Sequence, residues 1–358
     1  MAKLEIGVMD GLDVQELDEQ PQSYADLFDD HINYAKEAEQ LGYQYYFFIE
    51  HQNFVAPTIT SPNVYLAALA RETTTLRFGP MVYPLPFYHP IRLAQDSATL
   101  DHLSRGRLEF GIGYGIRANE FLPWKGVSHE DRRERGVEVM DIVLKAWTED
   151  SVTYDGRFFS FEDALPRPKP FQRPHPRIWV GAHSEISMDY AAQHNFNVAQ
   201  NIDTDAVAAE KFAYFKQAWE ACGRAGPLPH RLIVRHVHVA ETDEQARIEA
   251  EPYLLRGMRP DVLPALLAAG DNLPPRREPG HEGFNVIYTQ TAKSIDYWVE
   301  NGLALVGSPA TVAGQLAERS ERVGYDVFAA QHHIPAMPMD LVRKSLRMFG
   351  ERVIPALA

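Results

Sequence analysis

Short apolar segments and amphipathic segments alternate along nearly the whole chain, and this alternation limits the possible folds more than any other feature. A strand that is followed by a helix and a further strand usually pairs in parallel with its successor, because the helix provides the crossover. The alternation therefore predicts a parallel sheet covered by helices. The expected strands are 4–9, 45–49, 76–83, 108–112, 178–181, 197–199, 232–239 and 326–330. The expected helices are 23–41, 62–73, 90–103, 131–148, 184–194, 204–221, 309–323 and 339–352.

About eight such units favour an α/β fold of the (β/α)₈ TIM barrel type, with insertions in its loops. The alternative is an open, doubly wound sheet. That fold would be supported by G-x-G-x-x-G after the first strand, but the glycines at 111, 113 and 115 follow the fourth strand at a different spacing. We expect one barrel domain over 1–358, with excursions at about 149–176 and 241–300.

Composition excludes several classes of protein. The chain has 358 residues, is 45% hydrophobic and has a formal net charge of −14, which argues against a nucleic-acid surface and against electrostatic membrane anchoring. Cys222 is the single cysteine, so no internal disulfide can form. We see no signal-peptide pattern and no apolar run of 18 residues, and we expect a cytoplasmic protein.

The stretch from Asp101 to Gly115 reads D-H-L-S-R-G-R-L-E-F-G-I-G-Y-G. It predicts the end of a helix, a polar turn, a short apolar strand and a glycine-rich loop. In a barrel of this type, the loop after a strand faces the active site. Glycine in such a loop allows the backbone to approach a planar ligand closely.

This block and four other stretches resemble the bacterial luciferase-like monooxygenases in order and spacing. Glu50-His51 is similar to the family's E-H-H motif, with Gln52 in place of the second histidine. The other similar stretches are 79–90, 179–193 and 307–312. Matches in this order are specific to the superfamily but not to a substrate.

The resemblance implies a two-component, FMN-dependent monooxygenase. A separate flavin reductase would supply reduced FMN, and O₂ would form a flavin peroxide that oxidises a small apolar substrate such as an aldehyde, ketone, alkane or terpene. His51 would act in acid–base chemistry, which suits an imidazole because it titrates near neutral pH. Glu50 would orient His51 or contact flavin. The structural alternatives are a packed histidine and a carboxylate at the barrel rim.

The resemblance also assigns residues to the cofactor. Met81 and Val82 match a position where family members often have a cis peptide behind the flavin ring. Gly113, Tyr114 and Gly115 would line the pocket, although Tyr114 could merely pack. Aromatic side chains would make the pocket apolar, with core packing as the alternative: Phe47, Phe48, Tyr83, Phe87, Tyr88, Phe121 and Trp124.

A second group of residues would bind the FMN phosphate. His183, Ser184 and Ser187 stand at a predicted strand-to-helix junction, where free N–H groups attract anions. Simple N-capping by Ser184 needs no ligand and is compatible with that role. Arg132 matches a phosphate-pairing arginine of the family, and Arg133 is the fallback within the same charged run.

Several further possibilities remain open from the sequence. A deazaflavin-dependent (F420) hydride-transfer enzyme and a non-catalytic flavin-binding subunit are alternative functions. His236 and His238 alternate along a strand, but no third ligand is evident and we predict no metal. His332 or His333 could reach the pocket rim. Residues 270–290 are a candidate lid, and a homodimer, or a heterodimer with a related subunit, is expected through roughly 61–103.

Overall fold

The computed structural model describes residues 4–11, 23–53, 59–224, 226–256, 294–335 and 337–357. These residues form two compact units. The first, which we call the His51 unit, contains residues 23–39, 46–53 and 59–181, and the second, the Ser184 unit, contains 4–11, 40–45 and the described residues from 182 onward. Among the described residues, no helix combines the length and apolarity needed to cross a membrane.

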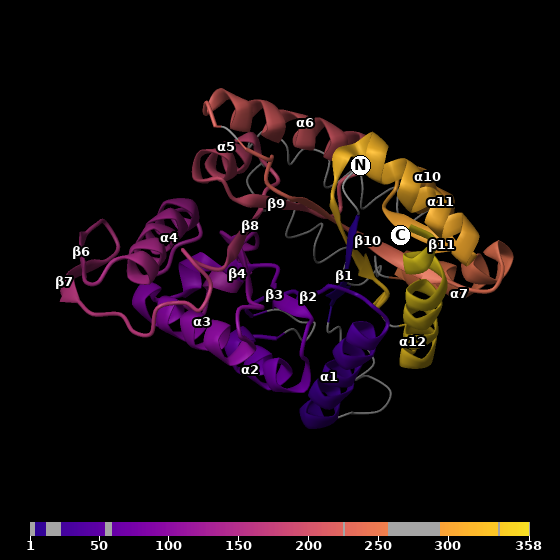
Figure 1. Cartoon of the computed structure of the whole chain (residues 1–358), viewed down its shortest axis with the longest axis horizontal. Helices are drawn as coiled ribbons and strands as arrows, with labels where there is room; N and C mark the ends of the chain where they lie inside the picture. Colours follow the sequence, from indigo (N-terminus) through magenta and orange to yellow (C-terminus); the bar gives the residue numbers. More distant parts are fainter. Residues whose placement is uncertain are drawn as a thin grey trace. The chain divides into compact units, whose positions relative to one another are not determined.

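The His51 unit contains alternating helices and short strands (Figure 1). Most of α1 and most of β2 lie in this unit. Its elements are α1 (Tyr24–Gln40), β2 (Tyr45–Phe48), α2 (Pro62–Glu72), β3 (Arg77–Pro80), β4 (Tyr83–Pro84), α3 (Pro90–Ser104), β5 (Glu109–Gly113), α4 (Arg132–Thr148), β6 (Val152–Asp155), β7 (Ser160–Ala164) and β8 (Arg177–Gly181).

Strands β4, β5 and β8 of the His51 unit pair in parallel, as the alternation predicts. β5 pairs with β4 on one side and with β8 on the other, with Glu109 opposite Arg177. Phe78 of β3 forms an isolated parallel bridge with Leu108. The N–H of Met81 donates to the carbonyl of Phe48 at 2.7 Å, which links the ends of β2 and β3. Helices α2, α3 and α4 follow one another along this unit in Figure 1.

The expected strand 76–83 is wrong in one respect, because it is two strands. β3 ends at Pro80, the peptide between Met81 and Val82 is cis, and β4 begins at Tyr83. The cis peptide is the one that the family resemblance implied. The side chain of Val82 occupies the space beside Gly113, where an added Cβ would lie 2.3 Å from Val82 Cγ2. Packing inside the protein is therefore sufficient to require glycine at position 113.

The excursion at 149–176 contains a β-hairpin that the sequence analysis missed. Strands β6 and β7 pair antiparallel, and in Figure 1 they lie beyond α4. Their turn is held by Glu138 of α4, whose carboxylate accepts the backbone N–H groups of Arg157, Phe158 and Phe159 at 3.0, 3.0 and 2.7 Å. A single buried carboxylate thus attaches the hairpin to the helix.

The Ser184 unit has the same alternating plan. Its elements are β1 (Glu5–Asp10), α5 (Glu185–His194), β9 (Asn197–Gln200), α6 (Asp205–Ala221), β10 (Arg231–Val239), α7 (Asp243–Arg256), α10 (Ile295–Glu300), β11 (Ala304–Gly307), α11 (Pro309–Arg319), β12 (Val327–Gln331) and α12 (Met339–Met348). Its parallel strand order is β1-β12-β10-β9, with Val327 opposite both Glu5 and Leu232.

β11 is a strand that the sequence analysis missed. It pairs with the second half of β10, from His236 opposite Ala304 to Val239 opposite Gly307. The described parts of the expected excursion at 241–300 are helical in α7 and α10. The candidate lid at 270–290 lies outside the described residues.

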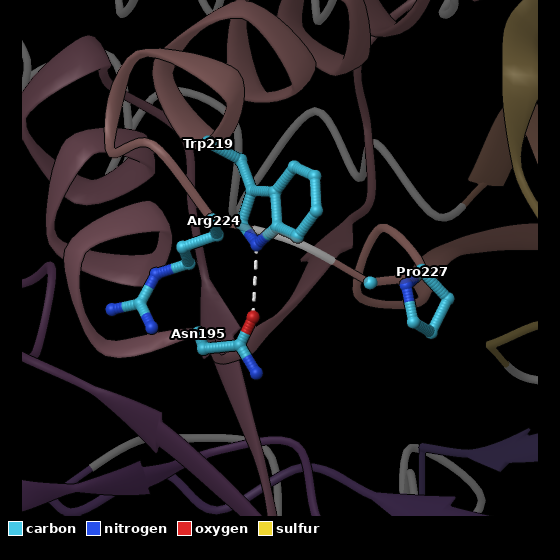
Figure 2. A pocket seen from close by; sticks show the side chains of 5 residues that line it. Asn195, Trp219, Arg224 and Pro227 are labelled. Atoms are coloured by element: carbon cyan, nitrogen blue, oxygen red, sulfur yellow. Dashed lines mark hydrogen bonds between the residues drawn. The ribbon is translucent and has the colours of Figure 1, made fainter.

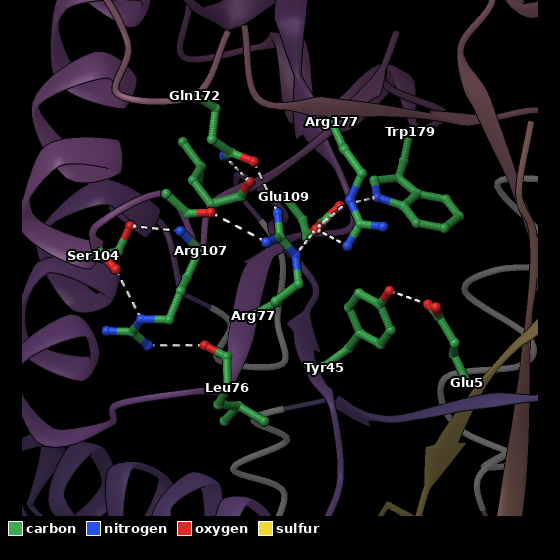
Figure 3. Close-up of polar contacts among 12 residues, drawn as sticks. Glu5, Tyr45, Leu76, Arg77, Ser104, Arg107, Glu109, Gln172, Arg177 and Trp179 are labelled. Atoms are coloured by element: carbon green, nitrogen blue, oxygen red, sulfur yellow. Dashed lines mark hydrogen bonds and ion pairs between the residues drawn. The ribbon is translucent and has the colours of Figure 1, made fainter.

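A buried carboxylate joins three strands of the His51 unit at their amino ends (Figure 3). Glu109 of β5 has no exposed surface. It accepts hydrogen bonds from Arg177 Nε at 2.9 Å and Trp179 Nε1 at 2.6 Å, both on β8, and from Arg77 of β3. Two guanidinium groups and an indole N–H compensate the cost of removing the Glu109 carboxylate from water. Glu109 and these three partners therefore stabilise the protein only when all of them are present.

We predict that Glu109→Ala destabilises the protein by about 3–5 kcal/mol, because it leaves two partly buried arginines without their counter-charge. Urea unfolding would measure the change. Glu162→Ala on the exposed face of β7 is the control, with an expected change within about 0.5 kcal/mol. Equal, small effects of both substitutions would contradict this account of Glu109.

Candidate functional site

Most of the predicted flavin-ring residues follow the carboxyl ends of strands in the His51 unit. Glu50 and His51 follow β2, the Met81–Val82 peptide follows β3, and Tyr114 follows β5. The carboxyl ends of parallel barrel strands are where active sites form, because the loops that follow them carry chemical groups on a rigid scaffold. The strand positions of these residues agree with the sequence analysis.

His51 lies against a buried carboxylate that the sequence analysis did not identify. His51 Nδ1 is 2.8 Å from Glu120 Oε1, and their side chains are 23% and 1% exposed. Arg117 Nη1 lies 3.5 Å from the same oxygen. A partly exposed imidazole beside a buried carboxylate can take up and release a proton.

Glu50 has hydrogen-bond partners other than His51. Its carboxyl group accepts hydrogen bonds from Tyr88 Oη at 2.7 Å and from Gln52 Nε2 at 2.8 Å. Burial raises the pKa of Glu50 from 4.5 to about 8, against the lowering effect of these two hydrogen bonds, and the nearby charge of Glu120 adds to the rise. Glu50 is therefore a largely neutral carboxylic acid at pH 7.

The loop that carries Glu120 is clasped to the loop that carries His51. Asn53 Nδ2 donates to the carbonyl of Asn119 at 2.7 Å, and Asn119 Nδ2 donates to the carbonyl of Asn53 at 3.2 Å. Asn53 lies two residues after His51, and Asn119 directly precedes Glu120. The reciprocal bonds therefore tie together the backbone beside both members of the His51–Glu120 pair. They explain how two loops separated by 66 residues hold a 2.8 Å contact between side chains.

Aromatic rings pack around the loop that carries Glu120. Phe87 lies 4.6 Å from Phe121 and 5.4 Å from Trp124, measured between ring centroids. Trp124 is 37% exposed and Leu122 is 79% exposed, so the cluster reaches the surface of the unit. Phe47, Phe48 and Tyr83, three of the seven aromatics predicted to line a pocket, are fully buried.

Tyr114 carries a buried hydroxyl that has no hydrogen-bond partner among the described residues. Burial raises its pKa to about 12, so the phenol stays neutral and available as a donor. The ring packs where a Cβ on Gly136 of α4 would be 2.5 Å from Tyr114 Cδ1. An orphaned, rigidly held donor of this kind is unusual inside a protein and fits a group that binds a polar ligand.

The two candidate phosphate arginines differ in their surroundings. Arg132 Nη1 donates to the carbonyl of His129 at 3.0 Å. The guanidinium of Arg133 lies 5.4 Å from the centre of the Tyr114 ring, a cation–π contact. Arg133, the fallback, is thus the arginine that contacts a second predicted cofactor residue. Gly115 has a φ of +74°, which an L side chain adopts only with strain.

His183, Ser184 and Ser187 meet at the start of α5 in the Ser184 unit. Ser184 is the N-cap and forms a capping box with Ser187: Ser187 N donates to Ser184 Oγ at 3.4 Å, and Ser184 N donates to Ser187 Oγ at 3.1 Å. The capping interpretation is therefore confirmed. His183 Nδ1 lies 3.8 Å from Asp203, which Lys211 Nζ contacts at 2.8 Å. A phosphate here would meet helix N–H groups, an imidazole and two serine hydroxyls that can change partners.

The other histidines have structural partners. His238 Nε2 lies 2.8 Å from Glu249 Oε2, and His236 packs edge-on against Trp298. His332 is buried between Tyr43 and Ser345, at 2.9 Å from each hydroxyl. Burial lowers the pKa of His332 to about 3 and that of His236 to about 4, so both rings are neutral. His333 is also buried, and neither it nor His332 extends to an open rim.

A cavity of about 320 Å³ lies away from the predicted residues (Figure 2). Asn195 and Trp219, whose side chains share a hydrogen bond of 2.8 Å, line it together with Arg224, Gly226 and Pro227. Asn195 precedes β9 and therefore lies at the amino end of that strand. Active sites of parallel α/β folds form at the opposite ends of the strands, so this cavity carries no functional assignment.

The chain belongs to the luciferase-like monooxygenase family. The family model matches residues 5–326. The resemblance first noted in separate motifs thus extends over most of the chain. The protein is an enzyme of the flavin-dependent monooxygenase class.

Two relatives illustrate the range of the family. A protein of Sinorhizobium fredii named y4wF is 33% identical over 347 residues, which cover 95% of this chain and 93% of the relative. Limonene 1,2-monooxygenase of Rhodococcus erythropolis is 26% identical over 299 residues, which cover 82% of this chain and 72% of that enzyme.

Two solved structures have the same fold. The monooxygenase RslO1 of Streptomyces bottropensis matches with a TM-score of 0.82 at 24% identity, covering 99% of this chain and 100% of the other. The oxygenating constituent of 3,6-diketocamphane monooxygenase of Pseudomonas putida, solved with FMN, matches with a TM-score of 0.80 at 22% identity, covering 99% and 98%. The predicted (β/α)₈ barrel is confirmed.

We predict that Glu50→Gln stabilises the protein at pH 8 but not at pH 4. Below pH 4.5 the carboxyl group is protonated in both the folded and the unfolded chain. Between pH 4.5 and about 8, only the unfolded chain loses its proton, so the wild type loses stability as the pH rises. Glutamine does not titrate, and its advantage should reach the order of 3–5 kcal/mol.

Urea unfolding at pH 4, 6 and 8 would measure this difference. Glu130→Gln, a change at an exposed carboxylate, is the matched control and should show no trend with pH. A constant difference between wild type and Glu50→Gln over this range would show that Glu50 is ionised in the folded protein.

Proposed function

We propose that this protein is the oxygenase component of a two-component, FMN-dependent monooxygenase. A separate reductase would supply reduced FMN, and a small apolar organic molecule would be the substrate. The reduced flavin supplies two electrons to O₂, so that one oxygen atom enters the substrate and the other leaves as water.

The observation that carries this proposal is the His51–Glu120 pair at the carboxyl end of β2. Oxygen transfer requires protons to be delivered and removed at defined moments, and a partly exposed imidazole is suited to that task near neutral pH. His51 is the group we assign to proton transfer. Glu50, neutral and hydrogen-bonded to Tyr88, would keep an additional negative charge away from the same region.

Each of the two units contains donors that are suited to part of FMN. The unpartnered phenol of Tyr114 is a neutral donor, next to the Arg133 guanidinium. Ser184, Ser187 and the first N–H groups of α5 are suited to a phosphate. We assign these residues to cofactor binding on the chemistry of their donors.

The aromatic cluster supports an apolar substrate. Phe87, Phe121 and Trp124 flank the residue that contacts His51, and Trp124 is partly exposed. Such a surface favours planar or aliphatic molecules over charged ones, since it offers contact area and no charge.

The test is an anaerobic titration of the purified protein with reduced FMN, followed by rapid mixing with oxygenated buffer. We expect saturable binding, and a delay between the consumption of O₂ and the release of hydrogen peroxide that free reduced FMN does not show. Reoxidation identical to that of free flavin would overturn the proposal. Binding of reduced deazaflavin in preference to FMN would instead indicate a hydride-transfer enzyme, and binding without any change in oxygen chemistry a non-catalytic subunit.

We predict that His51→Gln lowers turnover by about 100-fold or more, because a general acid–base residue contributes about 10²–10⁴ in rate. Affinity for reduced FMN should change little. Steady-state oxygenation with an accepted substrate would measure turnover, and His102→Gln on the exposed face of α3 is the control. Unchanged turnover in His51→Gln would rule out a catalytic role for this histidine.

We predict that Ser187→Ala weakens the binding of FMN but not of riboflavin, which has no phosphate. Loss of the capping box should also reduce stability by about 1 kcal/mol. Fluorescence titration with the two flavins separates a phosphate contact from a general loss of structure. Equal losses of affinity for FMN and riboflavin would show that Ser187 only caps the helix.

A further inference from the structure

We propose that the hydroxyl group of Tyr88 donates a hydrogen bond to an uncharged carbonyl oxygen of the bound flavin or substrate, and that protonated Glu50 makes this hydrogen available. The catalytic meaning of this inference rests on the proposed function. Its structural content is the direction of the hydrogen bond between Glu50 and Tyr88, which can be tested without cofactor or substrate.

Tyr88 joins the buried carboxyl group of Glu50 to the segment that carries the aromatic cluster. It follows the 3₁₀ turn Leu85–Phe87, which comes directly after β4, and Glu50 follows β2. Tyr88 is only partly buried, whereas Glu50 is 4% exposed. Phe87, the residue before Tyr88, packs on Phe121 at 4.6 Å between ring centroids. The phenol thus contacts a buried acid and belongs to a segment to which we assign contact with an apolar substrate.

The first step of the argument is that Glu50 keeps its proton at neutral pH. The hydrogen-bond partners of Glu50 among the described residues are the uncharged side chains of Tyr88 and Gln52. The carboxylate of Glu120 lies close enough to repel a second negative charge. Ionisation would therefore place a poorly compensated charge in a buried position, which is unfavourable. The rise of the pKa of Glu50 to about 8 agrees with this argument.

The second step is the orientation of the Gln52 side chain. Its Nε2 donates to Glu50 Oε1 at 2.8 Å and to the carbonyl oxygen of Thr60 at 3.2 Å. A backbone carbonyl only accepts hydrogen bonds, so the nitrogen and not the oxygen of the Gln52 amide must face it. The group that faces Glu50 Oε1 is therefore an N–H donor, which cannot accept a hydrogen.

The third step places the hydrogen of the carboxylic acid. A buried O–H group has to donate to an acceptor. Of the two partners of Glu50, the amide nitrogen of Gln52 cannot accept, whereas a phenol oxygen can both donate and accept. The hydrogen therefore lies on Oε2 and is donated to Tyr88 Oη, which is 2.7 Å away. When Glu50 is ionised the direction is reversed, because a carboxylate only accepts.

The fourth step concerns the hydrogen of the Tyr88 hydroxyl. While Oη accepts from Glu50, its own hydrogen points elsewhere, and no further hydrogen bond joins this hydroxyl to the part of the chain that the structure describes. Tyr83 packs edge-on against Tyr88 at 5.5 Å between ring centroids, and its own hydroxyl is engaged by Asn63. The hydrogen of Tyr88 is thus available to a bound molecule.

The surroundings of Tyr88 define the class of acceptor. The ionisable groups that act on the Glu50–Tyr88 pair are Glu120, Asp96 and Tyr83, and the two carboxylates disfavour a bound anion. A hydroxyl that points its hydrogen at the ligand disfavours a cation. The conditions fit an uncharged oxygen on an otherwise apolar molecule, and a carbonyl group is the simplest such acceptor. The ring of a flavin and an aldehyde or ketone substrate both carry one.

The direction of the hydrogen bond can be measured in the cofactor-free protein. Infrared spectroscopy would follow the C–O stretch of tyrosines labelled with ¹³C at the ring carbon that bears the hydroxyl, with Tyr88→Phe to assign the Tyr88 band. The C–O bond of a phenol is weaker when the oxygen accepts and stronger when the hydroxyl donates. We therefore expect the Tyr88 band to rise in wavenumber between pH 6 and pH 9, as Glu50 ionises. In Glu50→Gln this rise should be absent.

Tyr88→Phe also supplies the binding measurement. We expect it to weaken the ligand that carries the acceptor by about 3- to 10-fold, the effect of one hydrogen bond between neutral groups. Lumiflavin, which has the flavin ring carbonyls but no phosphate chain, tests the flavin as the source. Cyclohexanone, compared with methylenecyclohexane, in which a CH₂ group replaces the oxygen, tests the substrate. Tyr24→Phe, at a tyrosine of α1 that is 60% exposed, is the matched control.

The outcomes separate the parts of the inference. A Tyr88 band that keeps its wavenumber between pH 6 and pH 9 would overturn the role of Glu50. Unchanged affinity of Tyr88→Phe for both carbonyl probes, or no binding of either probe by the wild type, would overturn the ligand contact. Failure of the wild type to bind reduced FMN, with the pH-dependent band intact, would overturn the proposed function and leave the direction of the hydrogen bond in place.

Discussion

The buried charge of Glu109 is the constraint on which the His51 unit depends most directly. One carboxylate in the interior has to satisfy the amino ends of three strands at once, through Arg77, Arg177 and Trp179. The Met81–Val82 peptide follows β3 and Tyr114 follows β5, so both lie beyond the carboxyl ends of strands whose amino ends Glu109 joins.

The two ends of this unit use buried carboxylates differently. Glu109 is surrounded by cations and N–H donors, which compensate its charge. Within the part of the chain that the structure describes, no cation pairs with Glu50, and burial raises its pKa to about 8. Glu120 lies between these extremes, with an imidazole and a more distant guanidinium. The unit thus contains three buried carboxylates with different roles. Glu109 maintains structure, Glu50 is mainly neutral, and Glu120 has a partner that can exchange protons.

The alternation of segments was enough to predict most elements and the barrel, because helix and strand periodicities are local properties of the sequence. The break at Met81–Val82 and the strand β11 were not found from periodicity, since both depend on which neighbouring strand is available. Glu50 and His51 were identified from their motif. Glu120 was missed because its role depends on a contact across 69 positions, which spacing along the chain does not reveal. Its one signal was a carboxylate five residues beyond the glycine-rich loop.

The hairpin attached to α4 shows how such a barrel can change without losing its frame. The carboxylate of Glu138 binds three backbone N–H groups of the turn, and backbone N–H groups are the same whatever side chains the turn carries. The amino-acid sequence of the turn is thus largely uncoupled from its attachment. Substitutions there can accumulate, and new surface chemistry can arise at that edge, while a single glutamate keeps the excursion in place.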